Sequence, residues 1–251
     1  MMKLRKRGKL IIIFFAIAVI LGGACMYAVY NGYILLNNPS KGRYPIRGVD
    51  VSHYQGEIDW EVLAAEEIQF AYIKATEGSS HVDDKFLYNL EQAKKTDLLV
   101  GAYHFFSFDS SGEKQAKNFI KNIELDEYML PPVVDVEYYG NKKKNQPNAD
   151  KLREELQIYL DTIQEYYNRT PIIYATEEMW NAYLKGYFDA YPLWIRNVIT
   201  KPQIDNEWTF WQYSNRGRLK GYQGEEAFID LNVFYGDEEQ WMEFYKIQVE
   251  R

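Results

Sequence analysis

Short runs of β-branched and aromatic residues alternate along most of the chain with amphipathic stretches of helical spacing. Eight runs have the composition of strands, at residues 46–52, 69–75, 98–106, 132–137, 171–175, 193–196, 209–213 and 227–231. The stretches between the early runs are typical of helices, at residues 59–67, 83–95, 112–124 and 150–167. This repetition predicts parallel strands joined by crossover helices. Eight strands within about 200 residues favour a closed α/β barrel.

Two features refine this prediction of the fold. The last three strands are joined by shorter segments with little helical pattern, so we expect the barrel to be irregular at its end. A doubly wound open sheet is the rival architecture, but the glycine-rich phosphate turn expected after its first strand is absent. We therefore expect one barrel domain over residues 45–251.

The residues before this domain have the features of a membrane anchor. Residues 10–30 carry no charged side chain, and at about 1.5 Å of rise per residue a helix of this length crosses a hydrocarbon core of about 30 Å. Residues 1–9 hold five basic side chains and no acidic one. The sequence thus predicts a cytoplasmic tail over 1–9, a transmembrane helix over 10–30, a linker over 31–44 and an extracellular barrel.

Two other fates of this segment stay open. A cleaved signal peptide also combines a basic start with an apolar run, although this run is longer than usual and no clean cleavage site follows. Secretion after such a cleavage is the alternative to a single-pass anchor. Lipidation at Cys25 is a third possibility, because the residues before it approximate a lipoprotein box. All three place the barrel outside the membrane.

Composition restricts what the barrel binds. Outside the first 30 residues the net charge is −12, which argues against a nucleic-acid partner. Tyr, Phe and Trp make up 16% of the chain, a proportion typical of proteins whose clefts hold sugars or peptides. Cys25 is the only cysteine, so an intrachain disulfide and a cysteine zinc site are excluded.

Acidic side chains occur where several predicted strands end. Asp50 lies near the end of the first strand, Asp135 and Glu137 end the fourth, and Asp230 lies near the end of the eighth. Residues two apart on a strand project to the same face, so Asp135 and Glu137 should both point into the barrel mouth. Two carboxyl groups in one cleft cannot both ionise freely, and one then serves as an acid. That division of roles suits glycoside hydrolysis.

Other readings of the same residues remain. Cβ atoms two residues apart on a strand are separated by about 6 to 7 Å, which lies between the retaining and inverting geometries. Asp50, His53, His104 and Asp135 are also metal-ligand types, so a metal-dependent polysaccharide hydrolase is an alternative. A non-catalytic glycan-binding domain on the same fold is another.

The chain resembles the glycoside hydrolase family 25 lysozymes, the Chalaropsis-type N-acetylmuramidases. The resemblance covers about residues 47–234. The matching stretches, in the order of the family, are 48–56 with 58–60, 70–78, 101–105, 115–116, 134–137, 171–174, 193–195, 211–213 and 229–232.

This resemblance implies an irregular TIM-like barrel of (β/α)5(β)3 type. It also implies cleavage of the β-1,4 bond between N-acetylmuramic acid and N-acetylglucosamine in peptidoglycan, without a metal or another cofactor. Glu137 matches the general acid. Asp135 matches the carboxylate that orients the N-acetyl group or stabilises the developing cation, and Asp50 and Asp230 match the other acids of the cleft. The expected route is substrate-assisted, although a carboxylate nucleophile remains open.

The resemblance and the strand ends together give the expected substrate-binding residues, namely Tyr54, Gln55, Lys74, Glu77, Tyr103, His104, Tyr138, Tyr174, Trp194, Trp211 and Gln212. One departure from the family is Arg196, which stands after Trp194 and Ile195 where alanine is common. We expect the enzyme to act on glycan strands beside its own membrane, in wall degradation or remodelling, with any partner in the cell-surface machinery unknown.

Overall fold

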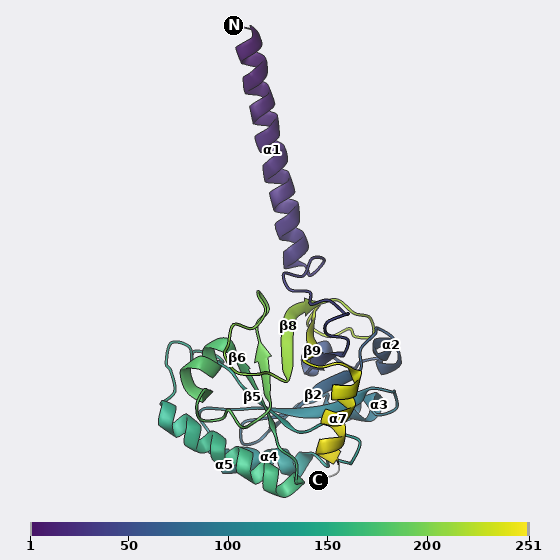
Figure 1. Cartoon of the computed structure of the whole chain (residues 1–251), viewed down its shortest axis with the longest axis vertical. Helices are drawn as coiled ribbons and strands as arrows, with labels where there is room; N and C mark the ends of the chain where they lie inside the picture. The colour runs from purple at the N-terminus through teal and green to yellow at the C-terminus, as the bar shows by residue number, and fades with distance from the viewer. Residues whose placement is uncertain (1, 250–251) are drawn as a thin grey trace.

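The computed structural model describes residues 2–249, and the side chains of residues 10–246. Helix α1 (Met2–Tyr30) extends away from the rest of the molecule as one long rod, and its last turn meets the barrel near β8 (Figure 1). Within α1, Leu10–Tyr30 has a mean hydropathy of 2.6 and none of it is buried. The side chains of the predicted cytoplasmic tail, 1–9, lie outside the described residues.

A closed sheet forms the centre of the barrel and confirms the predicted fold class. Its eight strands are β1 (Arg47–Val51), β2 (Phe70–Glu77), β4 (Leu99–Phe105), β5 (Val133–Val136), β6 (Ile172–Thr176), β7 (Leu193–Arg196), β8 (Phe210–Gly217) and β9 (Ile229–Phe234). The hydrogen-bonded order is β1-β9-β8-β7-β6-β5-β4-β2, and pairing between β1 and β2 closes the ring. The two-residue strand β3 (His81–Val82) extends the edge of β2.

Helices follow each of the first five barrel strands, whereas none lies between the last three. They are η1 (His53–Gln55) and α2 (Trp60–Ala64), α3 (Phe86–Ala93), α4 (Gly112–Asn122), α5 (Ala149–Tyr167), and α6 (Glu177–Met179) continued by η2 (Trp180–Leu184). A final helix, α7 (Glu238–Val249), comes after β9. This arrangement is the expected (β/α)5(β)3 pattern.

The direction of β9 differs from the prediction. The sequence places Asp230 near the carboxyl end of a strand at 227–231, whereas β9 spans Ile229–Phe234 and runs antiparallel to both of its neighbours, β1 and β8. Asp230 is therefore the second residue of its strand. It still reaches the catalytic edge, because an antiparallel strand begins where its parallel neighbours end.

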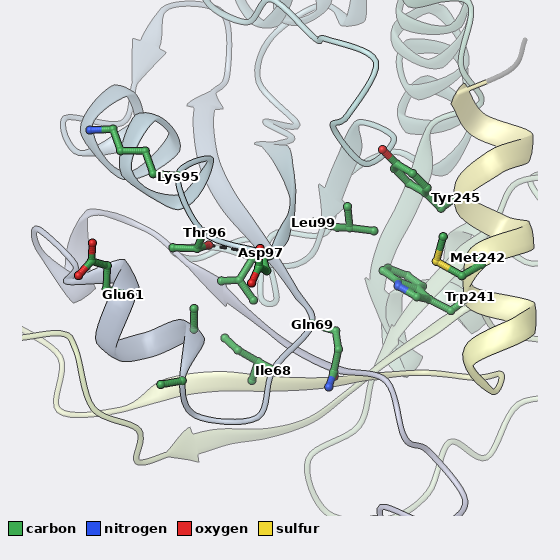
Figure 2. Close-up of a pocket in the computed structure, with 13 residues that line it drawn as sticks. Glu61, Ile68, Gln69, Lys95, Thr96, Asp97, Leu99, Trp241, Met242 and Tyr245 are labelled. Carbon is green, nitrogen blue, oxygen red and sulfur yellow. Dashed lines mark hydrogen bonds between the residues drawn. The ribbon is translucent and has the colours of Figure 1, made fainter.

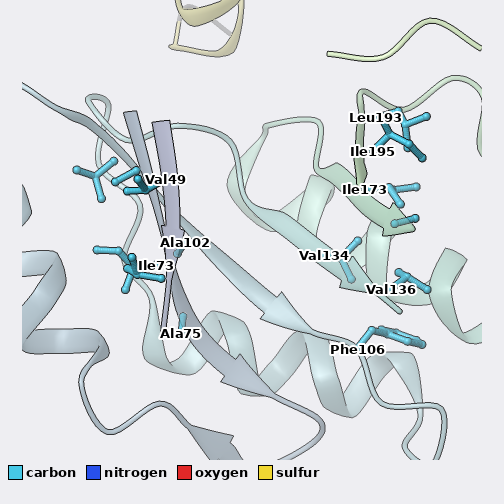
Figure 3. Packing of buried hydrophobic residues seen from close by; sticks show 14 of the residues in the cluster. Val49, Ile73, Ala75, Ala102, Phe106, Val134, Val136, Ile173, Leu193 and Ile195 are labelled. Atoms are coloured by element: carbon cyan, nitrogen blue, oxygen red, sulfur yellow. The ribbon is translucent and has the colours of Figure 1, made fainter. Parts of the chain in front are cut away.

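Alternation along the strands divides the buried side chains into two clusters. The cluster between the sheet and the helices contains small and β-branched residues such as Val49, Ile73 and Val134 (Figure 3). The cluster inside the barrel contains large rings, among them Phe70 and Trp194. The inner rings fill the lower barrel, so only the side chains near the strand ends are left to line a cup.

The segment between α1 and β1 lies against the barrel instead of hanging free. Arg216 donates to the carbonyl oxygen of Tyr30, and Arg218 Nε donates to that of Asn31 over 2.6 Å. The two guanidinium groups also stack on the rings of Tyr30 and Tyr33. We call these five residues the anchor clamp.

The fold of the chain at the end of α1 is specific. Gly32 has φ of +69°, and the amide of Tyr33 donates to the carbonyl of Ala28 over 2.9 Å, which is the geometry of a helix C-cap. A Cβ on Gly32 would lie 2.2 Å from the carbonyl oxygen of Arg216, so only glycine fits this approach. Further on, Asn37 donates to the carbonyls of Asn197 and Thr200.

Candidate active site

Four carboxyl groups meet at the mouth of the barrel. Asp50 comes from β1, Asp135 from β5, Glu137 from the residue just after β5, and Asp230 from the start of β9. All four were expected in the cleft. Because side chains alternate along a strand, Asp50 and Asp135 point inward while their apolar neighbours point towards the helices.

Asp50 and Asp230 form the first pair. They are directly opposed on the antiparallel strands β1 and β9. Gln212 Nε2 and Asn232 Nδ2 donate to Asp50 Oδ2, over 3.0 and 2.7 Å. Burial raises the pKa of Asp50, and these donors oppose the rise. Burial and the charge of Asp50 raise the pKa of Asp230 well above its usual range. Because two adjacent buried carboxyls repel one another when both are charged, this pair favours holding a proton.

Asp135 and Glu137 form the second pair. Burial and then the neighbouring Glu137 raise the pKa of Asp135 well above its usual range, and burial also raises the pKa of Glu137. Asp135 Oδ1 is buried and has no hydrogen-bond partner among the described residues. The pair holds one proton, since two adjacent buried carboxyls repel one another when both are charged.

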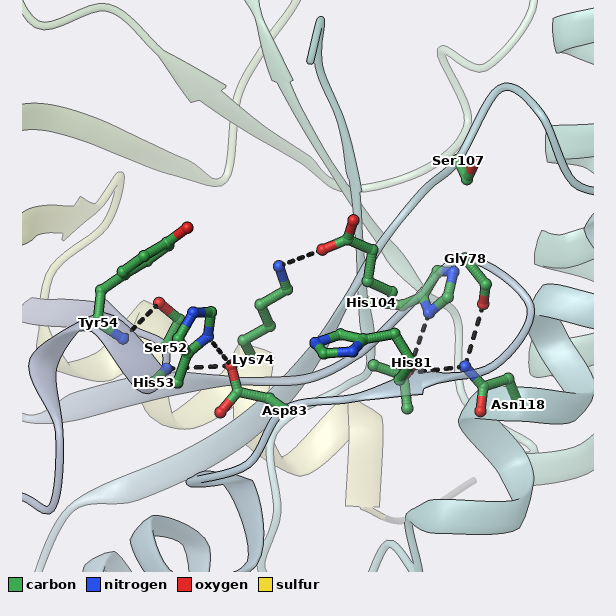
Figure 4. Close-up of polar contacts among 12 residues, drawn as sticks. Ser52, His53, Tyr54, Lys74, Gly78, His81, Asp83, His104, Ser107 and Asn118 are labelled. Atoms are coloured by element: carbon green, nitrogen blue, oxygen red, sulfur yellow. Dashed lines mark hydrogen bonds and ion pairs between the residues drawn. The ribbon is translucent and has the colours of Figure 1, made fainter. Parts of the chain in front are cut away.

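Two cations lie among these acids. Lys74 Nζ bonds Glu77 Oε2 over 2.7 Å (Figure 4). Glu77 faces the cup because a register shift between Lys74 and Thr76 changes the alternation of β2. Arg196, at the end of β7, contributes the second cation, and its charge lowers the pKa of Glu137 against the effect of burial.

The predicted aromatic residues divide by exposure. Tyr103, Tyr174 and Trp194 lie inside the barrel, where the Tyr174 hydroxyl donates to Gln212 Oε1 over 2.9 Å and Trp194 Nε1 donates to Asn232 Oδ1 over 3.0 Å. These rings support the cup from below. Tyr54 is 44% exposed and lies after the end of β1, so its face is open to a sugar.

Tyr138 is half-buried beside Glu137, and its hydroxyl donates to that of Tyr183 over 3.3 Å. Tyr138 packs with Tyr183 against the cluster on the helix side of the sheet, so it does not line the cup. Stacking on accessible rings is the usual way in which proteins bind the apolar faces of sugars. Of the predicted aromatics, Tyr54 is therefore the one whose exposed ring is in position to contact a glycan.

The structure also corrects three other expected substrate-binding positions. His104 faces α4 and α5, where Thr76 and Gln115 bond its two ring nitrogens and Tyr159 stacks on it. Burial lowers the pKa of His104 to about 3, so the ring is neutral.

Trp211 also faces away from the cup, with its Nε1 donating to the carbonyl of Asn197 over 2.8 Å. Gln55 is buried and closes a capping box with Ser52 at the start of η1. Trp211, Gln55 and His104 are therefore bonded to other parts of the protein instead of lining the cup.

Two polar residues near the site were not among those predicted. Asn232 bridges Trp194 and Asp50, and its position two residues after Asp230 on one strand would have placed it on the inner face. Asp83 accepts hydrogen bonds from the backbone and the Nδ1 atom of His53, at 3.0 and 2.7 Å (Figure 4). His53 and Asp83 are 30 positions apart, and no pattern in the sequence around either residue indicates that they form a hydrogen bond.

The residues of the metal alternative do not converge. His104 lies on the helix side of the sheet, whereas Asp135 lies on the inner side. Among the residues described, no group of three or more His, Cys, Asp or Glu side chains is arranged to hold a metal ion.

A separate cavity of about 730 Å³ opens at the other end of the barrel (Figure 2). It lies between α2, the loop before β4, and Trp241 and Tyr245 of α7. None of the predicted site residues lines it. The chemistry therefore belongs to the cup, where the titratable groups are gathered.

Comparison with known proteins agrees with this geometry. The model of glycosyl hydrolases family 25 matches residues 49–222. A family 25 glycosyl hydrolase from Bacillus anthracis superimposes with a TM-score of 0.79 and 48% identity, over 84% of this chain and 97% of that one.

Two characterised relatives match as well. Lysozyme M1 of Streptomyces globisporus is 33% identical over 76% of this chain and 68% of its own length. The N,O-diacetylmuramidase of Chalaropsis sp is 25% identical over 75% of this chain and 95% of its own length. The predicted resemblance is confirmed: the chain belongs to glycosyl hydrolase family 25 and is a glycosidase.

Proposed function

We propose that the protein is a muramidase that cleaves the β-1,4 bond between N-acetylmuramic acid and N-acetylglucosamine in peptidoglycan. The observation that carries this proposal is the buried Asp135 and Glu137 pair at the mouth of a family 25 barrel, where burial raises the pKa of both carboxyls. Related proteins named lysozyme and N,O-diacetylmuramidase support the choice of substrate.

The chemistry follows from the two carboxyl groups. In the substrate complex the proton shared by the pair moves to Glu137, which leaves Asp135 charged, and Glu137 donates this proton to the glycosidic oxygen as the bond from that oxygen to C1 breaks. Asp135 Oδ1, which has no partner among the described residues, accepts the N–H of the substrate's acetamido group. The acetamido carbonyl oxygen then attacks C1, and the charge of Asp135 stabilises the cationic ring that forms. Water opens this ring and gives its proton to Glu137, which restores the enzyme.

The test compares Glu137→Gln with the wild-type chain on purified cell walls. Soluble products are reduced with borohydride and identified by mass spectrometry. The wild type should release fragments with reducible N-acetylmuramic acid ends, and Glu137→Gln should release at least about a hundredfold less, because a positioned acid contributes roughly 10²- to 10⁴-fold. Glu154→Gln, at an exposed site on α5, is the matched control. Equal release by both variants would remove Glu137 from the mechanism.

Release of no fragment by the wild type, from several kinds of wall, would favour the glycan-binding alternative. Release of fragments that end in N-acetylglucosamine would place the cut at the other bond of the repeat. Each result identifies a different failure of the proposal.

We further propose that the enzyme acts at the outer face of the membrane, held by α1. The unburied apolar run Leu10–Tyr30 supports a retained helix, and the anchor clamp joins the end of that helix to the barrel. Arg216 is four residues beyond Gln212 on β8, which is about 13 Å along a strand. The cup therefore lies close to the point where the helix leaves the barrel.

The test is the mass of the N-terminal peptide and the membrane partition of the protein from cells. A retained anchor gives a peptide from residues 1–9 and release only by detergent. A soluble protein that begins after residue 25 would show signal-peptide cleavage, and a diacylglyceryl mass on Cys25 would show lipidation.

A further inference from the structure

Arg196 occupies a position in the cup that the proposed chemistry does not use. It is the last residue of β7, two positions after the inward-facing Trp194, and its backbone lies between Thr176 of β6 and Gln212 of β8. Strand alternation therefore directs its side chain towards the same space as the four carboxyl groups. The side chain is partly buried.

The guanidinium group of Arg196 has no hydrogen bond and no ion pair within the described part of the chain. The other cation of the cup differs, because Lys74 is bonded to Glu77 over 2.7 Å. Guanidinium groups elsewhere have partners: Arg169, for example, donates to two backbone carbonyls. A partly buried group with five donors and no protein acceptor is well placed for an acceptor on a ligand.

Charge limits which acceptor fits. Asp50, Glu137 and Asp230 all interact electrostatically with Arg196, so the surrounding cup is acidic. These acids repel a ligand carboxylate, and of the two cations in the cup Lys74 is already paired with Glu77, which leaves Arg196 to attract it. Arg196 therefore fixes where an anionic substituent of the glycan lies, and a carboxylate meets its two parallel N–H groups in a bidentate pair.

We propose that Arg196 is a specificity-determining residue that binds a carboxylate carried by the substrate's muramic acid unit. This inference rests on the proposed muramidase activity and specifies the substrate further. The carboxylate has two sources: the lactyl group of a muramic acid that has lost its peptide, and the stem peptide of an intact one. Of the two, the lactyl carboxylate is attached directly to the sugar and reaches the cup with the fewest free bonds.

The experiment measures kcat/KM for the full chain in detergent on three glycans. The first is intact peptidoglycan, the second is glycan stripped of its stem peptides by an amidase, and the third is the stripped glycan with its carboxylates converted to neutral amides. Arg196→Gln removes the charge, Arg196→Lys keeps it without the planar fork, and Arg43→Gln is the control at an exposed arginine.

The expected result is a loss of tenfold or more for Arg196→Gln on the stripped glycan, partial recovery in Arg196→Lys, and at most a twofold loss on the amidated glycan. A large loss on intact peptidoglycan with none on stripped glycan would move the contact to the stem peptide. An equal loss on all three, with a shifted pH optimum, would show that Arg196 acts only on the acids of the cup and would overturn the proposal.

The wild-type chain separates this proposal from the muramidase assignment. If the wild type releases no muramic acid ends from any of the three glycans, the assignment itself fails. The other outcome is that the wild type releases these ends while Arg196→Gln shows the same ratio of kcat/KM on stripped glycan to kcat/KM on amidated glycan as the wild type. In that case only the role of Arg196 fails.

Discussion

At the scale of single residues, the protonation of the cup is set by burial. Asp50, Asp135, Glu137 and Asp230 all have raised pKa values, and burial is the largest cause for each. A carboxyl whose pKa is higher in the folded than in the unfolded chain contributes to the free energy of unfolding at low pH. This contribution is lost as the pH rises through the pKa of the folded state. The site therefore reduces the stability of the barrel at neutral pH.

This argument predicts that Asp135→Asn stabilises the fold while it impairs activity. Near neutral pH the variant should unfold at a temperature higher by roughly 3 °C or more, since about 1 kcal/mol corresponds to about 2 to 4 °C in a domain of this size. The difference should vanish below pH 4, near the ordinary pKa of 3.8, because Asp135 is then neutral in both states. Scanning calorimetry across this range measures it, and a lower melting temperature at pH 7 would contradict the argument.

A second prediction concerns Asn232, the residue that joins Trp194 to Asp50. Asn232→Asp keeps the acceptor for Trp194 but replaces the donor to Asp50 with a repelling charge. We expect kcat/KM on purified walls to fall about tenfold to a hundredfold, which is the usual effect of losing a hydrogen bond to a charged group. Asn141→Asp, on an exposed turn, provides the control. Matching activities in the two variants would show that Asp50 needs no such support.

Residue patterns in the sequence predict part of this site. Spacing of two along a strand places Asp135 and Glu137 on one face, and the acids at strand ends do meet. The same reasoning fails for His104 and Trp211, because each is one position from an inward residue and faces the helices. The type of a polar or aromatic residue at a strand end does not indicate whether its side chain points into the barrel or towards the helices. The register of the whole strand decides this.

At the scale of elements, sequence patterns give the number and the order of strands but not their local irregularities. The register shift in β2 that brings Glu77 to the cup depends on pairing with β4, which lies more than 20 residues away. The antiparallel direction of β9 depends on the short connection from β8. Both are decided by partners in space, and local composition does not encode them.

A third prediction belongs to the strand β4. A Cβ on Gly101 would lie 2.1 Å from the ring of Tyr72, which is fully buried and donates to the carbonyl of Pro131. Gly101→Ala should therefore displace Tyr72 and destabilise the barrel by about 1 to 3 kcal/mol, seen as a lower melting temperature. Gly42→Ala, where nothing lies within 4 Å of the added carbon, should leave it unchanged. A neutral Gly101→Ala would mean that the inner cluster rearranges freely.

At the scale of the whole molecule, the anchor clamp decides how the barrel is held. A fourth prediction is that the double variant Arg216→Gln with Arg218→Gln frees the segment 31–38 from the barrel, because the two side chains bond the carbonyls of Tyr30 and Asn31 and stack on Tyr30 and Tyr33. Limited proteolysis of the protein in membranes should then cut within 31–38 at least about tenfold faster. Activity on soluble wall fragments should stay the same, and an unaltered cleavage rate would show that the clamp does not hold the segment.

If α1 is retained in the membrane as proposed, the clamp also has a consequence for dosage. An enzyme that is fixed to its own anchor with little free chain reaches only the glycan within a small radius of that anchor, however fast it turns over. Once those bonds are cut, further damage to the wall requires lateral diffusion or new protein. The extent of wall opening is then proportional to the number of molecules inserted in the membrane, and the cell controls it through expression.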